Sequence, residues 1–203
     1  MTLNSNYVLS NFDTNCYGIY SIGEWNLGGF YSLRNPYYLE FKKQIIATLC
    51  VDILVLPEIH CLPEESVIID NFTTFQNNRL PISRANRGSG GIAIALHNKL
   101  LDTHDVISVI KGVDGQLALI LKNSLTDFTV GILALYLPPD SFHYGKDPET
   151  FFNEAAVLYE DLSECDLVVG SGDLNSRTKE IIEYIPDIDG NLIPPRPDQK
   201  LTC

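Results

Sequence analysis

Polar side chains able to bind a cation or a phosphate follow three apolar, strand-like runs in this sequence. Asp173 and Asn175 stand two positions apart after one such run, and a glycine precedes them. Because side chains alternate along a strand, both are expected on one side of it. Glu58 ends a second run, and Asn26 precedes two glycines at the end of a third. Three strand ends that offer amide and carboxylate oxygens predict a hydrolytic site with a bound Mg²⁺ or Mn²⁺ ion.

Each of these side chains has a defined chemical capacity and an ordinary alternative. Glu58 is the best ligand candidate if its strand end holds and partly desolvates it; otherwise it is a solvated loop acid. Asp173 can orient or activate a water molecule, and Asn175 can donate to a phosphate oxygen without adding negative charge. Alternatively, the pair belongs to a turn that caps a strand. Asn26 alone is a weak signal, because asparagine is common in turns.

Two further residues are candidates for contact with a substrate. Tyr136 ends an apolar strand before two prolines, where its hydroxyl could reach a phosphate, although most such tyrosines are core or rim residues. Arg87 opens a glycine-rich stretch that could contact a nucleic-acid backbone or be an ordinary polar loop. The stretch is not a P-loop, because the Gly-Lys-Ser/Thr ending is absent. A serine hydrolase is not indicated, because the Gly-x-Ser-x-Gly elbow is missing.

The composition restricts the class of protein. A net charge of −12 argues against a broad electrostatic hold on nucleic acid, which depends on many Lys and Arg side chains at phosphates. A bound divalent ion would make an acidic cleft locally positive, so a nuclease is still compatible with this charge. Five scattered cysteines without a Cys-x-x-Cys pair indicate reduced thiols in an intracellular protein. No apolar run approaches the roughly 18 residues that span a bilayer, so no membrane contact is expected.

The elements that must position these residues are expected to form an α/β fold. Residues 1–16 are expected to be a leader, 17–203 a domain, and 185–197 an extended loop. Turn residues favour antiparallel pairing of the four strands between 90 and 137. Two sheets packed face to face, with helices outside, would bury every strand. Strands are predicted at 17–26, 52–56, 90–96, 106–110, 116–122, 128–137 and 166–169, and helices at 37–50 and 147–163.

Five segments, taken in order, resemble the endonuclease/exonuclease/phosphatase superfamily, and specifically the apurinic-type endonuclease domain of non-LTR retrotransposons. They are WNLGG, DILVLPEIH, RGSGGIAIAL, LALYLPPD and LVVGSGDLNSRT. The resemblance covers residues 17–178. It implies a DNase I-like, four-layer αββα sandwich of two mixed sheets, and hydrolysis of phosphodiesters or phosphomonoesters with Mg²⁺.

The resemblance also implies a role for each matched residue. Glu58 would bind the metal with Asn26 beside it, and Tyr136 would contact the scissile phosphate. Asp173 would position the attacking water, and Asn175 would help to hold the phosphate. The family's closing Ser-Asp-His motif is absent from the sequence. The domain is therefore expected to be incomplete at its C-terminus and impaired by itself.

The leading prediction is a fragment of a Mg²⁺-dependent DNA endonuclease of retroelement origin, located inside the cell, in the nucleus. DNA is the expected partner, with substrate contacts from Asn26, Asn175 and Arg87. One alternative is a phosphatase acting on small phosphate esters or lipid head groups, which the acidic charge would suit better. Another is a catalytically dead remnant that acts as a binding module.

Overall fold

The computed structural model describes most of the chain. The chain divides into two compact units, of which the larger is Ser5–Asn175. In the smaller unit, Met1–Asn4 with Ser176–Cys203, the short strands β10 (Ile185–Pro186) and β11 (Leu192–Ile193) pair antiparallel. The described residues are 10–14, 18–31, 36–79, 88–138, 148–175, 185–186 and 192–193.

Five of the described strands form a mixed sheet in the order β1-β2-β3-β5-β4. β2 and β3 run parallel because helix α1 (Pro36–Thr48) crosses over between them, and the other neighbours are antiparallel. The strands are β1 (Ser10–Thr14), β2 (Gly18–Glu24), β3 (Ile53–Pro57), β4 (Phe72–Asn77) and β5 (Ile92–His97).

Four of the described strands form a second mixed sheet in the order β6-β7-β8-β9. The first three are antiparallel neighbours, and β8 runs parallel to β9 after the crossover helix α3 (Pro148–Asp161). The short helix α2 (Asn98–Leu101) connects this sheet to the first one. The strands are β6 (His104–Lys111), β7 (Gln116–Asn123), β8 (Thr129–Tyr136) and β9 (Leu167–Asp173).

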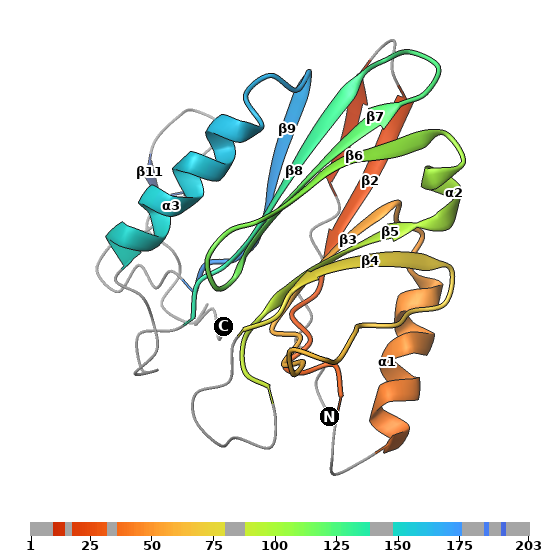
Figure 1. The fold of residues 1–203 in the computed structure, drawn as a ribbon, viewed down its shortest axis with the longest axis vertical. Coiled ribbons are helices and arrows are strands. Elements are labelled where there is room, and N and C mark those ends of the chain that lie inside the picture. Colours follow the sequence, from red (N-terminus) through yellow and green to blue (C-terminus); the bar gives the residue numbers. More distant parts are fainter. Residues whose placement is uncertain are drawn as a thin grey trace. The chain divides into compact units, whose positions relative to one another are not determined.

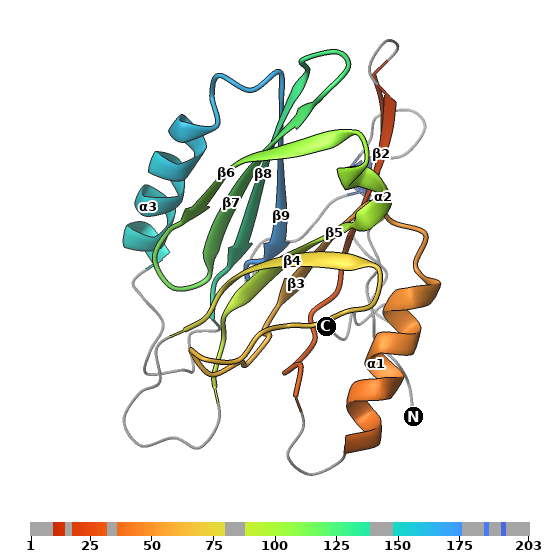
Figure 2. The same ribbon diagram turned by 45° about the vertical axis from the view of Figure 1, so that its right-hand side comes forward.

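The largest core cluster lies between the two sheets, and each long helix covers an outer face. Along β3, Ile53 points into the core between the sheets, whereas Leu54 joins the cluster that contains Ile46 of α1. Leu158 of α3 packs in a third cluster on the second sheet. Figures 1 and 2 show α1 and α3 on the outer sides of the sheets. This order of helix, sheet, sheet and helix confirms the predicted four-layer sandwich.

Each strand and helix predicted between residues 17 and 173 is present, but one pairing was wrong. β5 was expected beside the strands that follow it, yet it lies between β3 and β4, because α2 turns the chain into the other sheet. β4 and α2 were not predicted. β1 lies inside the expected leader, and β10 and β11 lie inside the expected loop. No described helix has the length and apolarity needed to cross a membrane.

Candidate active site

The predicted site residues meet because each sheet contains one parallel pair of strands. Parallel strands end at the same edge of a sheet, so the segments after β2 and β3 run side by side. Their backbones are bonded directly: the Leu27 N–H donates to the Pro57 carbonyl (3.1 Å), and the Gly29 N–H donates to the Glu58 carbonyl (2.7 Å). These bonds place the turn that carries Asn26 against the turn that carries Glu58.

Asn26 connects this edge to the second sheet. Its side-chain Nδ2 donates to Oδ2 of Asp173 at 2.8 Å, and its Oδ1 accepts a hydrogen bond from the Gly28 N–H at 3.0 Å. The amide is therefore oriented by partners on both of its polar atoms. Two residues that lie 147 positions apart in the sequence form one contact, as the prediction of a common site requires.

Glu58 has an unusual backbone conformation just after β3. Its φ of 55° lies in the left-handed region, and so does the φ of His60 at 51°. Residues other than glycine adopt this region at a cost of about 1–3 kcal/mol, and such residues concentrate at functional sites. The Glu58 side chain is partly buried; its Oε2 lies 3.9 Å from Nε2 of His60. Its other oxygen, Oε1, accepts a hydrogen bond from the Tyr136 hydroxyl at 3.0 Å.

Tyr136 is the last residue of β8 and is buried. Burial raises the pKa of its phenol above the usual range, and the charge of Glu58, the hydrogen bond to Glu58 and the charge of Asp173 raise it further, while Arg79 opposes them. The hydroxyl therefore keeps its proton at neutral pH and donates a hydrogen bond to Glu58. Tyr136 also pairs in register with Asp173 of β9. Because Tyr136 is bonded to Glu58 as well, the carboxylates of Glu58 and Asp173 both lie near it.

Asp173 and Asn175 are related differently from the prediction. β9 ends at Asp173, and Asn175 has a φ of 45°, so strand alternation does not extend to Asn175. The two residues are nevertheless joined, because the Asn175 backbone N–H donates to Oδ1 of Asp173 at 2.9 Å. The Asn175 side-chain amide donates to the Leu137 carbonyl at 2.8 Å, which fixes the segment after β8.

The residues brought together suit a hard cation. Among the described residues, no group of three or more His, Cys, Asp or Glu side chains could hold a metal ion. Mg²⁺, however, commonly uses one or two carboxylates and keeps several waters, so it does not need such a cluster. Glu58 supplies carboxylate oxygens, and Oδ1 of Asn26 has a second lone pair beyond its bond to Gly28. This oxygen-only donor set fits Mg²⁺ or Mn²⁺.

Two basic residues lie beside the site, and one of them, Lys42, was not assigned a role from the sequence. Lys42 of α1 is buried, and its Nζ donates to the carbonyls of Leu27 (2.8 Å) and Gly29 in the turn that carries Asn26. Burial lowers the pKa of Lys42 to about 8. Arg79 is also buried, and its Nε lies 3.4 Å from Asp114. Arg87, the predicted substrate contact, lies outside the described residues.

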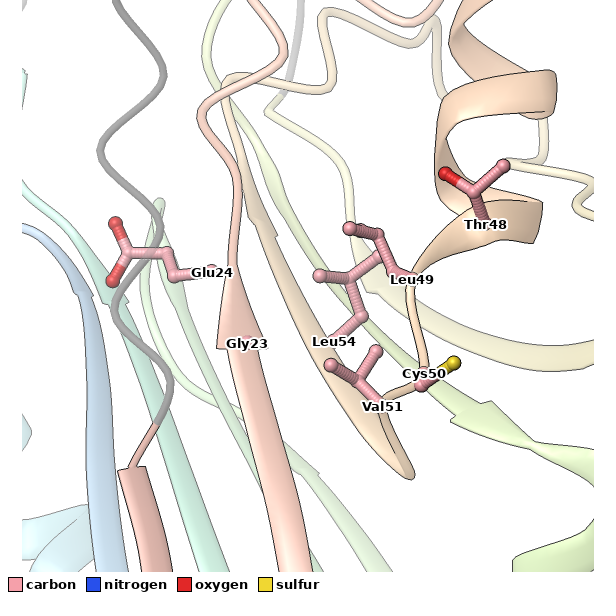
Figure 3. A pocket seen from close by; sticks show the side chains of 7 residues that line it. All are labelled: Gly23, Glu24, Thr48, Leu49, Cys50, Val51 and Leu54. Atoms are coloured by element: carbon pink, nitrogen blue, oxygen red, sulfur yellow. The ribbon is translucent and has the colours of Figure 1, made fainter.

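An apolar pocket of about 380 Å³ lies apart from these residues. Figure 3 shows it between the end of α1 and strands β2 and β3. None of the five predicted site residues that the structure describes lines it, and its lining is almost entirely apolar. A hydrolytic site needs polar groups, so this pocket is not the candidate active site. The lining residues are Gly23, Glu24, Thr48, Leu49, Cys50, Val51 and Leu54.

Comparison with known proteins identifies the fold. No family model and no curated protein matches the chain. Among solved structures, it is similar to AP endonuclease LMAP from Leishmania major, with a TM-score of 0.56 and 14% identity over 86% of this chain. It is also similar to the 3′ phosphatase NExo from Neisseria bound to a product DNA hairpin (TM-score 0.52, 16% identity, 81% of this chain). The chain has the endonuclease/exonuclease/phosphatase fold.

Truncated Caenorhabditis elegans TDP2 has the same fold, with a TM-score of 0.51 and 19% identity over 80% of this chain. The chain spans 60%, 61% and 64% of the lengths of the Leishmania, Neisseria and Caenorhabditis chains. The endonuclease/exonuclease/phosphatase fold confirms the resemblance read from the sequence motifs. A retroelement origin stays a prediction.

Proposed function

We propose that this chain is the catalytic part of a divalent-cation-dependent phosphodiester hydrolase that acts on DNA. The observation that carries the proposal is the pair of cross-sheet hydrogen bonds, from Asn26 to Asp173 and from Tyr136 to Glu58. They bring the amide of Asn26 and the acid of Glu58, from the edge of the first sheet, against the acid of Asp173 and the phenol of Tyr136, from the second sheet. Structures named as an AP endonuclease and a 3′ phosphatase share this fold and support the proposed substrate class.

Glu58 and Asn26 would hold the cation, which supplies neutralising charge for the departing oxygen. Asp173 would accept a proton from, or orient, the attacking water. Both Asp173 oxygens receive hydrogen bonds, from the Asn26 side chain and from the Asn175 backbone, so the carboxylate is fixed in orientation before substrate arrives. A fixed carboxylate avoids the cost of reorganisation during reaction.

Tyr136 would orient Glu58 through its single O–H, and it would contact a phosphate oxygen by turning this O–H from Glu58 to the substrate. Its proton already points at Glu58, and its raised pKa keeps the phenol neutral, so it adds no negative charge where a phosphate would bind. Asn175 would contribute through its amide, whose second N–H remains for a phosphate oxygen beyond its bond to Leu137.

Nicking of supercoiled plasmid DNA with Mg²⁺ or Mn²⁺ tests this function. Wild-type protein should convert supercoiled to open-circular plasmid slowly, in keeping with the impairment expected from the sequence. EDTA should stop this reaction, and Asp173→Ala should abolish it. The control variant is Asp102→Ala, which removes an exposed acid in the turn after α2. Equal nicking by the Asp173→Ala and wild-type proteins, or nicking in EDTA, would show that another site or a contaminant is responsible.

A phosphatase acting on small phosphate esters is the second candidate, and the net charge of −12 favours it because long DNA would be repelled. Phosphate release from soluble esters without plasmid nicking would select it. The retroelement origin and the nuclear location remain part of the first proposal. Imaging of the tagged protein tests the location, and exclusion from the nucleus would contradict it.

A further inference from the structure

A carboxylate outside the predicted site connects the two sheets directly beside it. Glu24 is the last residue of β2, and its Oε2 accepts hydrogen bonds from the Ser171 hydroxyl (3.2 Å) and the Gly172 N–H (2.9 Å) of β9. The side chain is partly buried, which strengthens bonds to a charged acceptor. Figure 3 shows the Glu24 carboxylate on the opposite side of β2 from Leu49 and Leu54, away from the apolar pocket.

The end of β9 depends on support from outside its own sheet. β9 is an edge strand, because β8 is its one neighbour in the described sheet. An edge strand leaves one row of backbone groups without strand partners. The Gly172 N–H belongs to this row and donates a hydrogen bond to Oε2 of Glu24 in the other sheet. Residue 172 must be glycine, since its φ is 149° and a Cβ atom would lie 1.8 Å from the Leu135 carbonyl oxygen.

Glu24 and Asn26 form two successive connections between the first sheet and β9. They stand two positions apart, and both side chains reach β9. Glu24 binds Ser171 and Gly172, and Asn26 binds the next residue, Asp173, at 2.8 Å. The Asp173 carbonyl also accepts a hydrogen bond from the Leu137 N–H, and the preceding residue, Gly172, is bonded to Glu24.

We propose that Glu24 is a positioning residue that holds the end of β9 so that the Asp173 carboxylate meets Asn26 and can orient the attacking water. This assignment rests on the proposed function as far as catalysis is concerned. Glu24 acts through hydrogen bonds that its carboxylate accepts, and it does not touch the substrate. A glutamine side chain keeps one accepting oxygen, so Glu24→Gln should preserve most of this positioning. Glu24→Ala has no side-chain acceptor and should lose it.

Amide hydrogen exchange measured by NMR tests the positioning without any need for activity. In Glu24→Ala the Gly172 amide should exchange about 10-fold faster or more, because its acceptor is lost. In Glu24→Gln it should stay within about 3-fold of wild type. The Leu133 amide in β8 should not change, and Glu64→Ala, which removes an exposed acid, should resemble wild type. An unchanged Gly172 amide in Glu24→Ala, or equal loss of protection at Leu133, would overturn the proposal.

Steady-state nicking rates test the catalytic consequence. Glu24→Ala should lower kcat by about 10-fold to 100-fold with KM for plasmid unchanged, and Glu24→Gln should recover most of the loss. Glu24→Gln as inactive as Glu24→Ala would overturn the proposal, because the charge itself would then be required. If wild-type protein cleaves no DNA, the proposed function fails, and the exchange rates at Gly172 alone decide whether Glu24 holds β9.

Discussion

Replacing Lys42 by methionine should change how the free energy of unfolding depends on pH. Lys42 is 1% exposed, and burial lowers its pKa from 10.5 to about 8. Between these two values the unfolded chain holds a proton that the folded chain has released, so raising the pH through this window stabilises the folded state. Each pH unit contributes about 1.4 kcal/mol, and the whole window contributes about 3 kcal/mol.

Methionine keeps an apolar stem of similar length but removes the charge and the donors. The carbonyls of Leu27 and Gly29 lose their Lys42 partner, which costs about 1–3 kcal/mol per group at every pH. That cost shifts the stability of the variant without adding a pH dependence. The stability difference between wild type and Lys42→Met should therefore grow by about 2 kcal/mol between pH 7.5 and pH 9.5, in favour of wild type.

Urea unfolding followed by circular dichroism, at about pH 7.5, 8.5 and 9.5, measures this difference. Tyrosine and cysteine side chains titrate in both proteins, so their contributions cancel. Lys43→Met is the matched control, since Lys43 is the next residue of α1 and pairs with Glu40 at the surface (3.7 Å). Its curve should parallel that of wild type. A difference for Lys42→Met that stays constant within about 0.5 kcal/mol would refute the lowered pKa.

Three substitutions around the site have further expected outcomes. Glu58→Gln should abolish Mg²⁺ binding in calorimetry without altering the circular dichroism spectrum, because a carboxylate is a far better ligand than an amide; an unchanged titration would exclude Glu58 as a ligand. Tyr136→Phe removes the donor to Glu58, so denaturant unfolding should show a loss of about 1–3 kcal/mol, and no loss would contradict the bond. Gly172→Ala should disrupt β9, because its Cβ would meet the Leu135 carbonyl; a wild-type NMR spectrum would contradict this.

The sequence predicted that polar residues at the ends of apolar runs lie close together, and the structure shows these contacts, whereas their roles in catalysis stay a prediction. Asn26, Glu58, Tyr136 and Asp173 stand at such places, and parallel pairing brought their strand ends together. β4 was missed because its six residues are mostly polar and form no apolar run. Its Phe and Thr residues are nevertheless good strand formers, and this signal could have identified it.

The residues that support the site could not be predicted, because their roles depend on distant contacts. Glu24 stands in an ordinary strand and Lys42 in an ordinary helix, and neither has a local pattern that indicates its partners. Their bonds reach Gly172 and Leu27, which only the folded arrangement places nearby. The conformation of Asn175 was likewise set by the turn after β9 and not by strand alternation.

The bond between Asn26 and Asp173 has a consequence for biosynthesis. Its two ends are separated by 147 positions, and β9 is synthesised after every other strand of the two sheets. A nascent chain that has already formed the first sheet and β8 contains Asn26, Glu58 and Tyr136 but has no Asp173. Closing so long a loop is entropically costly, so this contact should form late. Any hydrolytic competence would therefore arise only after β9 has been synthesised and has docked on β8.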